Sequence, residues 1–264
     1  MSHFLKLLLF LCGLSGIIGQ ALAEGASNPA DHPGPGLVII YHCDPQMRSD
    51  LRDALKGGLS KRLEAMARAG QVARYQVLMS RYVDSEGFDA AALIQFADVA
   101  GLSAWGAVEL NSAAGLPLKG AHGVNIQSVP VDLKRWAKAA SPSAGRPTYL
   151  IVPYEYLVSK SDYLAYLDAY TLPQFSGWMD EGVLAEHQIY LAQYPAGRSW
   201  SALIVLAYRD DQALALRESI TEKVRARLRD LPEWKAVSDN KAKVRIEKAP
   251  VVADLIAQSG NMGK

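Results

Sequence analysis

The sequence contains few cysteines, with only Cys12 and Cys43 among its 264 residues. We expect Cys12 to be removed with an N-terminal signal peptide, so that the mature chain keeps one thiol and has no intrachain disulfide. A single thiol in an exported domain is usually a small buried hydrophobic residue. The fold must therefore depend on a hydrophobic core, which a chain of roughly 240 residues is long enough to bury.

Neither sign of charge is in excess. The chain has 28 Lys and Arg residues against 27 Asp and Glu residues, for a formal net charge of +1 at pH 7. Such a balanced surface produces no long-range field that would attract nucleic acid or an acidic membrane. We therefore predict no nucleic-acid partner.

Long hydrophobic runs are missing outside the N-terminus. There, Lys6 precedes an apolar stretch over 7–19, and residues 21–23 form a small-x-small cleavage site, which is typical of a secretory signal peptide. The apolar stretch is too short to cross a bilayer as a stable helix. We predict a signal peptide over 1–23, a flexible arm over 24–36, and a periplasmic or secreted protein that is soluble after signal removal.

The common catalytic signatures are also missing. The sequence has no Gly-x-Ser-x-Gly, no phosphate-binding glycine loop and no paired-cysteine motif, and its five histidines are too scattered for a zinc site of the i, i+4 type. His42 and Cys43 are adjacent, but consecutive residues of a strand point to opposite faces. We predict no metal and no cofactor, and the role of Cys43 stays open.

What the sequence does contain is an internal similarity. Residues 37–98 align with 149–210 at a constant offset of 112 without a gap, and ten of the 62 pairs are identical. Gln76 and Gln188 occupy equivalent places, as do Tyr82 and Tyr194, so that a repeat would bring these pairs near a pseudo-twofold axis, where we expect cross-sheet hydrogen bonds. A repeat of this length determines the architecture.

The first repeat is predicted to contain a strand over 37–43, a helix beginning at Asp44-Pro45, a hairpin of strands over 73–82 and 88–96, and a second helix from Asp98. A closing strand includes Val124 and Ile126 and ends at Pro130. The first helix is indicated by one apolar face, made of Leu51, Leu55, Leu59, Leu63 and Met66.

The second repeat follows the same order. Its strands are expected over 149–156, 185–194 and 200–208, and its first helix begins at the capping-box-like residues 159–162. Its second helix is long and directs Ala213, Ile220, Val224 and Leu228 inward, and its closing strand includes Val244 and Ile246 before Pro250. Eight residues are added around 232–240. The predicted domains are the first repeat over 37–138, a linker over 139–147 and the second repeat over 148–258.

The order β-α-β-β-α-β builds a ferredoxin-like unit with both helices on one face of an antiparallel sheet. With two such units, the chain resembles the dimeric α/β-barrel superfamily, here as a tandem within one chain. We therefore predict an α+β fold in which two ferredoxin-like repeats pair their antiparallel sheets as a pseudo-dimeric α/β barrel. The resemblance implies binding of small hydrophobic or aromatic molecules between sheet and helices. It also implies chemistry of the cofactorless oxygenase, isomerase or haem-handling kinds.

Aromatic residues are unequally divided between the two repeats. Residues 37–96 hold five and the equivalent 149–208 hold twelve, and Pro173 falls inside the first helix of the second repeat, where it should kink or break that helix. Ligand pockets are mostly apolar with a few polar groups, so we predict a cleft in the second repeat, although the same residues could be ordinary core. The predicted ligand-binding residues are Tyr163, Trp178, His187, Trp200 and Tyr208.

Three functions remain open. The first hypothesis is an exported protein that binds a small apolar or aromatic molecule in this cleft without a cofactor. The second is a cofactorless oxygenase or isomerase with His187 as base. The third is a protein-interaction module that docks through the Ala- and Gly-rich helix over 99–115. Haem is disfavoured because neither second helix contains a histidine. Assembly into a homo-oligomer stays open.

Overall fold

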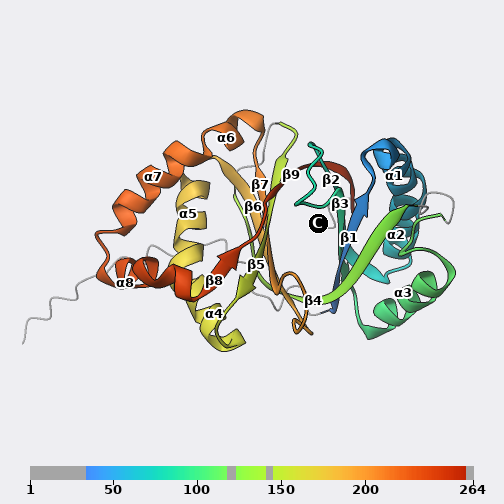
Figure 1. Cartoon of the computed structure of the whole chain (residues 1–264), viewed down its shortest axis with the longest axis horizontal. Coiled ribbons are helices and arrows are strands. Elements are labelled where there is room, and N and C mark those ends of the chain that lie inside the picture. The colour runs from blue at the N-terminus through green and yellow to red at the C-terminus, as the bar shows by residue number, and fades with distance from the viewer. Residues whose placement is uncertain (1–33, 118–122, 141–144, 260–264) are drawn as a thin grey trace, which may run out of the picture.

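The computed structural model describes residues 34–117, 123–140 and 145–259. The predicted signal peptide and most of the predicted arm lie outside these residues. Within them, no helix is both long and apolar enough to cross a membrane. The chain folds into a large antiparallel sheet in the middle, with helices on its two outer sides (Figure 1). The fold class is therefore α+β, as predicted.

The first half begins with a strand and a helical segment that changes its winding twice. Asp98 caps the later helix α3 by accepting a hydrogen bond from the Gly101 amide at 2.8 Å, and Gly70 ends α2 with a φ of +72°. The elements are β1 (Gly36–Cys43), the short 3₁₀ segment η2 (Pro45–Met47), α1 (Arg48–Ala54), the π-helical η3 (Leu55–Leu59), α2 (Ser60–Arg68), β2 (Val72–Ser80), β3 (Ala90–Phe96), α3 (Val99–Asn111) and β4 (Val124–Lys138).

The second half has the same order of main elements, with two helices and one short strand more. Asp210 caps α6 through the Ala213 amide at 2.8 Å, as Asp98 caps α3. The added residues form α8. The elements are β5 (Thr148–Tyr156), α4 (Lys160–Tyr166), the π-helical η5 (Leu167–Thr171), α5 (Leu172–Asp180), β6 (Leu184–Ala192), β7 (Ala202–Tyr208), α6 (Asp211–Ala215), α7 (Arg217–Leu228), α8 (Pro232–Asn240), the 3₁₀ segment η6 (Lys241–Lys243), β8 (Arg245–Glu247) and β9 (Val251–Gln258).

The sheet closes on itself. Its strand order is β7-β6-β4-β1-β3-β2-β9-β5-β8, and β5 also pairs with β7. Followed from neighbour to neighbour, eight of these strands return to their starting point, while β8 adds a three-residue bridge to β5. A closed ring leaves no long unpaired edge, which suppresses edge-to-edge aggregation.

The last strand of each half crosses into the other half. β4 pairs with β1 up to Val131 and then with β6 from Val131 to Lys138, and β9 pairs with both β5 and β2. The prediction that the closing strand ends at Pro130 is wrong, because β6 offers new backbone partners beyond that residue. The prediction that 244–246 forms the closing strand is likewise incomplete, because the longer β9 follows after Pro250.

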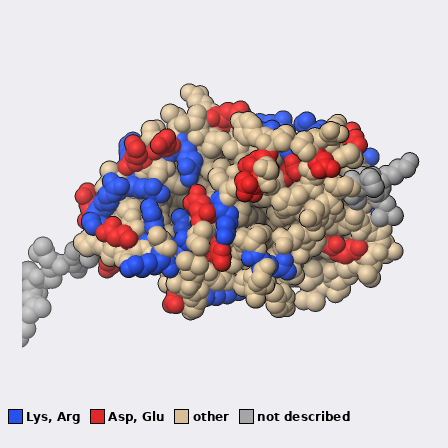
Figure 2. Space-filling model, viewed as in Figure 1, with Lys and Arg blue, Asp and Glu red and all other residues tan. Residues whose placement is uncertain are grey.

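Three hydrophobic cores hold the molecule together. One lies between the first-half helices and their sheet, one between the second-half helices and their sheet, and one inside the ring of strands. The apolar face predicted for the first helix is confirmed, since all five of its side chains are buried against the sheet. On the molecular face shown in Figure 2, acidic and basic side chains are interspersed.

Pro173 does not break its helix. The segment α4–η5–α5 is continuous, and Pro173 lies in the first turn of α5 directly after the π-helical turn η5, where a proline is tolerated. The first half has a π-helical turn at the equivalent place, Leu55–Leu59, and contains no proline there. The altered winding therefore does not depend on Pro173, and the predicted opening of this helix is wrong.

Candidate functional site

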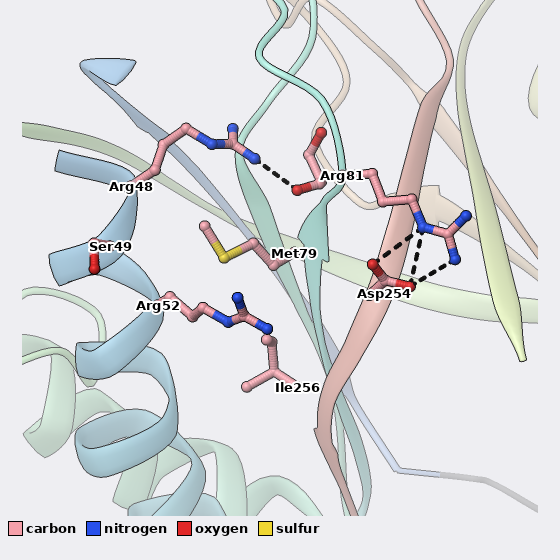
Figure 3. Close-up of a pocket in the computed structure, with 8 residues that line it drawn as sticks. Arg48, Ser49, Arg52, Met79, Arg81, Asp254 and Ile256 are labelled. Atoms are coloured by element: carbon pink, nitrogen blue, oxygen red, sulfur yellow. Dashed lines mark hydrogen bonds and ion pairs between the residues drawn. The ribbon is translucent and has the colours of Figure 1, made fainter. Parts of the chain in front are cut away.

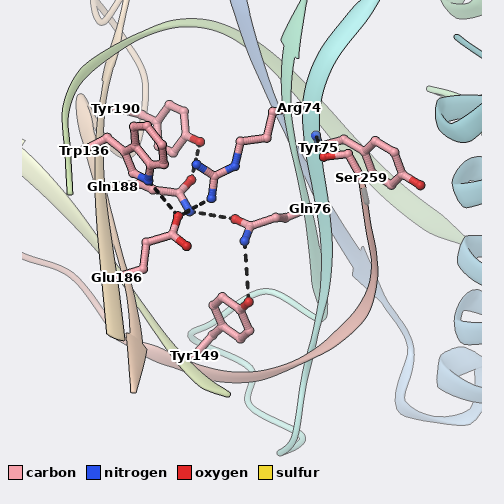
Figure 4. Close-up of polar contacts among 9 residues, drawn as sticks. All are labelled: Arg74, Tyr75, Gln76, Trp136, Tyr149, Glu186, Gln188, Tyr190 and Ser259. Carbon is pink, nitrogen blue, oxygen red and sulfur yellow. Dashed lines mark hydrogen bonds and ion pairs between the residues drawn. The ribbon is translucent and has the colours of Figure 1, made fainter. Parts of the chain in front are cut away.

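Inside the ring of strands, two glutamines from opposite halves are in contact. Gln188 Nε2 donates a hydrogen bond of 2.8 Å to Gln76 Oε1, and both side chains are buried (Figure 4). The sequence predicted cross-sheet hydrogen bonds at this place, and for the glutamines the contact is confirmed. Tyr82 and Tyr194 take no part, because they are 63% and 69% exposed.

Other polar groups complete this interior network. Arg74 forms an ion pair with Glu186, which also accepts hydrogen bonds from Trp136 Nε1 at 2.9 Å and from Gln188 Nε2 at 2.8 Å. The guanidinium of Arg74 lies 5.0 Å from the ring centre of Trp136, and Tyr190 donates to Gln188 Oε1. Because these polar groups satisfy one another, the network stabilises the ring and offers a ligand few free groups.

The predicted ligand-binding residues divide between two cores. Tyr163 in α4, Trp178 in α5 and Tyr208 at the end of β7 belong to the core between the second-half helices and their sheet. His187 in β6 joins them through its ring contact with Phe175 of the same core. Trp200 belongs to the core inside the ring, on the other face of the sheet. The structure therefore brings together four of the five and separates Trp200 from them.

His187 is packed among aromatic rings. Its ring centre lies 5.1 Å from that of Phe175, which in turn lies 5.2 Å from Trp178. Burial lowers the pKa of His187 from its usual 6.5 to about 4. The imidazole is therefore neutral at neutral pH and keeps a basic nitrogen.

Polar atoms without partners are concentrated in this core. Among the residues that the structure describes, only one buried side-chain atom of this kind, Gln95 Oε1, belongs to the first half. In the second half, the hydroxyls of Tyr170 and Thr221, Trp178 Nε1 and His187 Nδ1 have no hydrogen-bond partner. The hydroxyls of Tyr163 and Tyr166 lie against Arg245 and that of Tyr208 against Arg217; these guanidinium groups can donate to the phenolic oxygens, while the phenolic protons have no acceptor. Four of the five predicted residues are among these side chains.

The tyrosines of this set form a stack. Successive ring centres from Tyr156 through Tyr163, Tyr166 and Tyr170 to Trp234 are 4.9, 6.0, 5.2 and 5.0 Å apart. Trp234 is supplied by α8, which the added residues form. Tyr166, Tyr170 and Trp234 are not among the predicted site residues, although Tyr166 and Tyr170 follow Tyr163 at helical spacing, a signal that points to them.

Two arginines border the same core. Arg245 lies 3.9 Å from the ring centre of Tyr154 and 5.5 Å from that of Tyr166, and Arg217 lies 5.8 Å from that of Trp178. Burial raises the pKa of Tyr166 and Tyr208 to about 12, while Arg245 and Arg217 respectively act in the opposite direction. The phenols therefore stay protonated and face cations, so the core offers mainly hydrogen-bond donors.

Cys43 is partly buried and not activated. Burial and, after it, the nearby Asp89 carboxylate together raise the pKa of its thiol to about 11. Its amide donates a hydrogen bond to Asp89 Oδ2 at 2.8 Å. Because the thiolate is the reactive form, this environment favours an inert residue.

Metal ligands do not gather in the part of the chain that the structure describes, where no group of three or more His, Cys, Asp or Glu side chains could hold a metal ion. His32 and His122 lie outside the described residues. The absence of a cofactor stays a prediction. So does docking through α3, whose Val99 and Leu110 are 70% and 88% exposed.

Comparison with known proteins shows the fold alone. No protein-family model matches the chain, and no curated protein matches it. Among solved structures, an "anthrone oxidase-like protein" has a TM-score of 0.56 and 13% identity over 89% of this chain and 95% of that chain. A "putative monooxygenase" from Fusobacterium nucleatum subsp. nucleatum has a TM-score of 0.54 and 8% identity over 86% and 95% of the two chains. Another "putative monooxygenase", from Lactobacillus acidophilus NCFM, has a TM-score of 0.51 and 7% identity over 85% of this chain and 95% of that chain.

These likenesses and the sheet define the class of fold. The large antiparallel sheet with helices on its outer sides matches the ferredoxin-like dimeric α/β barrels, as the resemblance in the sequence indicated.

Proposed function

We propose that this protein binds a small, flat aromatic molecule in the core between the second-half helices and their sheet. The observation that carries the proposal is the set of buried polar atoms without partners that surrounds His187 and the tyrosine stack. An unpaired buried polar group destabilises a fold by about 1–3 kcal/mol. Several such groups in one core would cost a large part of the net stability of a typical domain.

The chemistry of these atoms indicates what the ligand carries. Trp178 Nε1 and Arg217 Nε can only donate hydrogen bonds, and the tyrosine and threonine hydroxyls each have a proton to donate. None of the unpaired atoms in this core is a carboxylate or amide oxygen. A ligand that satisfies them must therefore bring acceptors, such as the oxygens of a quinone, a ketone or a phenolate.

The surrounding rings support an aromatic ligand. Stacked contacts at 4.9–6.0 Å join the tyrosines and Trp234, and a flat aromatic ligand beside them would make contacts of the same favourable kind. The guanidinium groups of Arg217 and Arg245 add cationic contacts to ring faces. We propose the four predicted residues of this core as ligand contacts, with Trp200 excluded by its place on the other sheet face.

Binding is tested with a matched pair of probes. Anthraquinone-2-carboxylate and anthracene-2-carboxylate share a ring system and differ in the two carbonyl acceptors. We expect the quinone to quench tryptophan fluorescence with about tenfold higher affinity, because two hydrogen bonds of modest strength are worth about 1.4 kcal/mol together.

Two variants separate a specific site from general hydrophobic binding. Tyr163→Phe should reduce this preference for the quinone, whereas Tyr82→Phe, which changes an exposed tyrosine, should leave it unchanged. Equal affinity for the two probes, or a crystal structure in which ordered water alone satisfies the buried donors, would refute the proposal.

A second candidate function is cofactorless oxidation at this site. Two observations favour it: His187 is a buried neutral base with an unpaired Nδ1, and the fold is similar to proteins named as monooxygenases and as anthrone oxidase-like. His187 would accept a proton from the methylene carbon of an anthrone, and the resulting carbanion would react with O₂. Overall, anthrone and one O₂ would give anthraquinone and one water.

Oxygen uptake with anthrone distinguishes an enzyme from a binding protein. If the second candidate is right, His187→Phe should abolish oxygen uptake while the remaining three contacts still bind the probe, and His42→Phe at the exposed end of β1 should leave both unchanged. If the unaltered protein binds the quinone without consuming oxygen above the spontaneous rate, the enzyme hypothesis fails and the binding function stands.

We also propose that the chain arose from a doubled ferredoxin-like unit. β2 and β6 have bounds 112 residues apart, as do β3 and β7, and the contacts Arg74–Glu186 and Gln76–Gln188 each join residues 112 apart. Contacts between equivalent positions are what a pseudo-twofold axis produces at its centre.

Export is proposed from residues 1–23 alone, which lie outside the described residues. The test is the mass of the protein purified from its own cells. A mature N-terminus at Glu24 supports cleavage by a signal peptidase, and an intact N-terminus contradicts it.

A further inference from the structure

We propose that a cavity in the first half is a separate binding site for a small amphipathic carboxylate. The cavity has a volume of about 360 Å³ and lies between α1 and the ends of β2 and β9 (Figure 3). Three arginines line it, namely Arg48 and Arg52 from α1 and Arg81 from the end of β2. Its size is within the range of ordinary small-molecule sites.

Two of the three arginines are held in place. Arg48 forms an ion pair with Asp89, and its Nη2 donates to the Ser80 carbonyl at 2.6 Å. Arg81 donates to Asp254 from Nε and Nη2 at 3.1 and 2.9 Å. Asp254, the acidic residue of the lining, is thus already neutralised and does not repel an incoming anion.

Arg52 has no such partner. Among the described residues, none gives its guanidinium a hydrogen bond or an ion pair, and in Figure 3 this group extends from the helix toward Ile256. A cation that no protein group satisfies is available for a ligand, and a planar guanidinium matches the geometry of a carboxylate.

The positive charge continues along the same helix. A neighbouring cavity of about 580 Å³ lies between α2 and the end of β9, and Lys56 and Lys61 line it. In the described chain neither lysine has an ion-pair partner, whereas the acidic Glu64 of that cavity is paired with Arg68. On its helix side, the cavity at Arg52 is therefore bordered by the further positive side chains of Lys56 and Lys61.

The opposite wall includes an apolar strip. Met79 and Ile256 line the first cavity beside Ser80, Arg81 and Asp254, and Ala257 continues the strip into the second cavity. An amphipathic carboxylate fits both walls, because its carboxylate can pair with Arg52 while its short hydrocarbon chain packs against Met79 and Ile256. This site lies on a different half from the proposed aromatic site and does not depend on it.

The experiment compares octanoate with 1-octanol by isothermal titration calorimetry on the full mature chain. We expect octanoate to bind, 1-octanol to bind at least about fivefold more weakly, and the octanoate affinity to fall when the salt concentration rises, because the ion pair with Arg52 is exposed. Arg52→Glu should weaken octanoate binding by about fivefold or more, the factor that corresponds to one modest ionic interaction.

Arg62→Glu is the matched control. Arg62 is an exposed arginine of α2 that does not line either cavity, so the same change of charge there should leave the affinity within about twofold. Tyr163→Phe, in the aromatic core, should also have no effect. Equal binding of octanol and octanoate, equal losses in the two arginine variants, or no octanoate binding at millimolar concentration would each overturn the proposal.

Discussion

Buried polar side chains are used in two opposite ways in this protein. Inside the ring of strands, Arg74, Glu186 and the two glutamines satisfy one another. In the second-half core, the hydroxyls and ring nitrogens around His187 are left unpaired. The first arrangement is what a structural network requires, and the second is what a site for a polar-edged ligand requires.

The stability of the fold should depend strongly on keeping both members of the ion pair between Arg74 and Glu186. The two side chains are only 18% and 11% exposed, so Glu186→Ala leaves a desolvated guanidinium and should lower the free energy of unfolding by about 3–5 kcal/mol. Arg68→Ala, which breaks a pair whose members are 74% and 54% exposed, should lower it by less than about 1 kcal/mol.

Urea unfolding of the two variants measures this difference. A double variant, Arg74→Met with Glu186→Leu, should recover much of the stability, because it removes both charges together. If Glu186→Ala is no more destabilising than Arg68→Ala, the pair is not desolvated in solution.

His187 makes the stability of the fold depend on pH. Its pKa is about 4 in the folded chain against a usual 6.5, so between these values the unfolded chain binds more protons and acidification favours unfolding. The stabilisation is complete above pH 6.5 and is lost as the pH falls through this window, by roughly 3 kcal/mol in total.

His187→Phe should remove this part of the pH dependence. Between pH 7 and pH 4, the free energy of unfolding of the unaltered chain should fall by roughly 3 kcal/mol more than that of the variant. His42→Phe, at an exposed position, is the control for loss of a histidine. A difference that stays constant with pH would mean that His187 is hydrated in the folded protein.

At the scale of elements, the first helix of each half has an unusual winding with a physical cause. Buried positions recur every four residues, at 51, 55, 59 and 63 and again at 163, 167, 171 and 175. In an α-helix each such step drifts by about 40° around the axis. The π-helical turns Leu55–Leu59 and Leu167–Thr171 absorb an extra residue and keep this face toward the sheet.

Two neighbouring glycines of the first π-helical turn test this packing. A Cβ added at Gly57 would meet nothing within 4 Å, whereas one added at Gly58 would lie 2.5 Å from Cδ of Pro117. Gly57→Ala should stabilise the fold by about 0.5–1 kcal/mol through helix propensity. Gly58→Ala should destabilise it by about 1–3 kcal/mol through overpacking.

Thermal unfolding of the two variants gives the comparison directly, because they differ by one position and carry the same substitution. Similar midpoints for both would mean that the loop carrying Pro117 does not rest on the helix in solution.

At the scale of the whole molecule, the halves depend on each other through their strands. A fragment over 34–140 would keep β4 and lose β6, the partner of its second part, and would leave β2 without β9. Exposed edges of this kind pair with other chains. We expect the fragment to dimerise or aggregate, as measured by sedimentation, and a stable monomer would contradict the interdependence of the halves.

Much of the fold could be predicted from local patterns. The helix starts at Asp98 and Asp210 and the helix end at Gly70 follow from capping and turn chemistry. The end of β4 could not be predicted, because a proline such as Pro130 usually ends a strand. Here β4 continues, since β6 supplies new backbone partners beyond Pro130. For the candidate site, the sequence correctly grouped four residues in one core. It could not predict that Trp200 is separate, because that depends on which face of the sheet its loop turns toward.

The sequence by itself determined the order of the strands and helices from β1 to α3 and from β5 to β7, and the aromatic character of the second half, because periodicity, caps and composition act between residues close in the chain. Only the tertiary structure decided that β4 and β9 cross between the halves, that the sheet closes, and that Gln76 meets Gln188. It also decided which polar groups around His187 find partners. These outcomes depend on contacts between residues far apart in the chain, which no local pattern specifies.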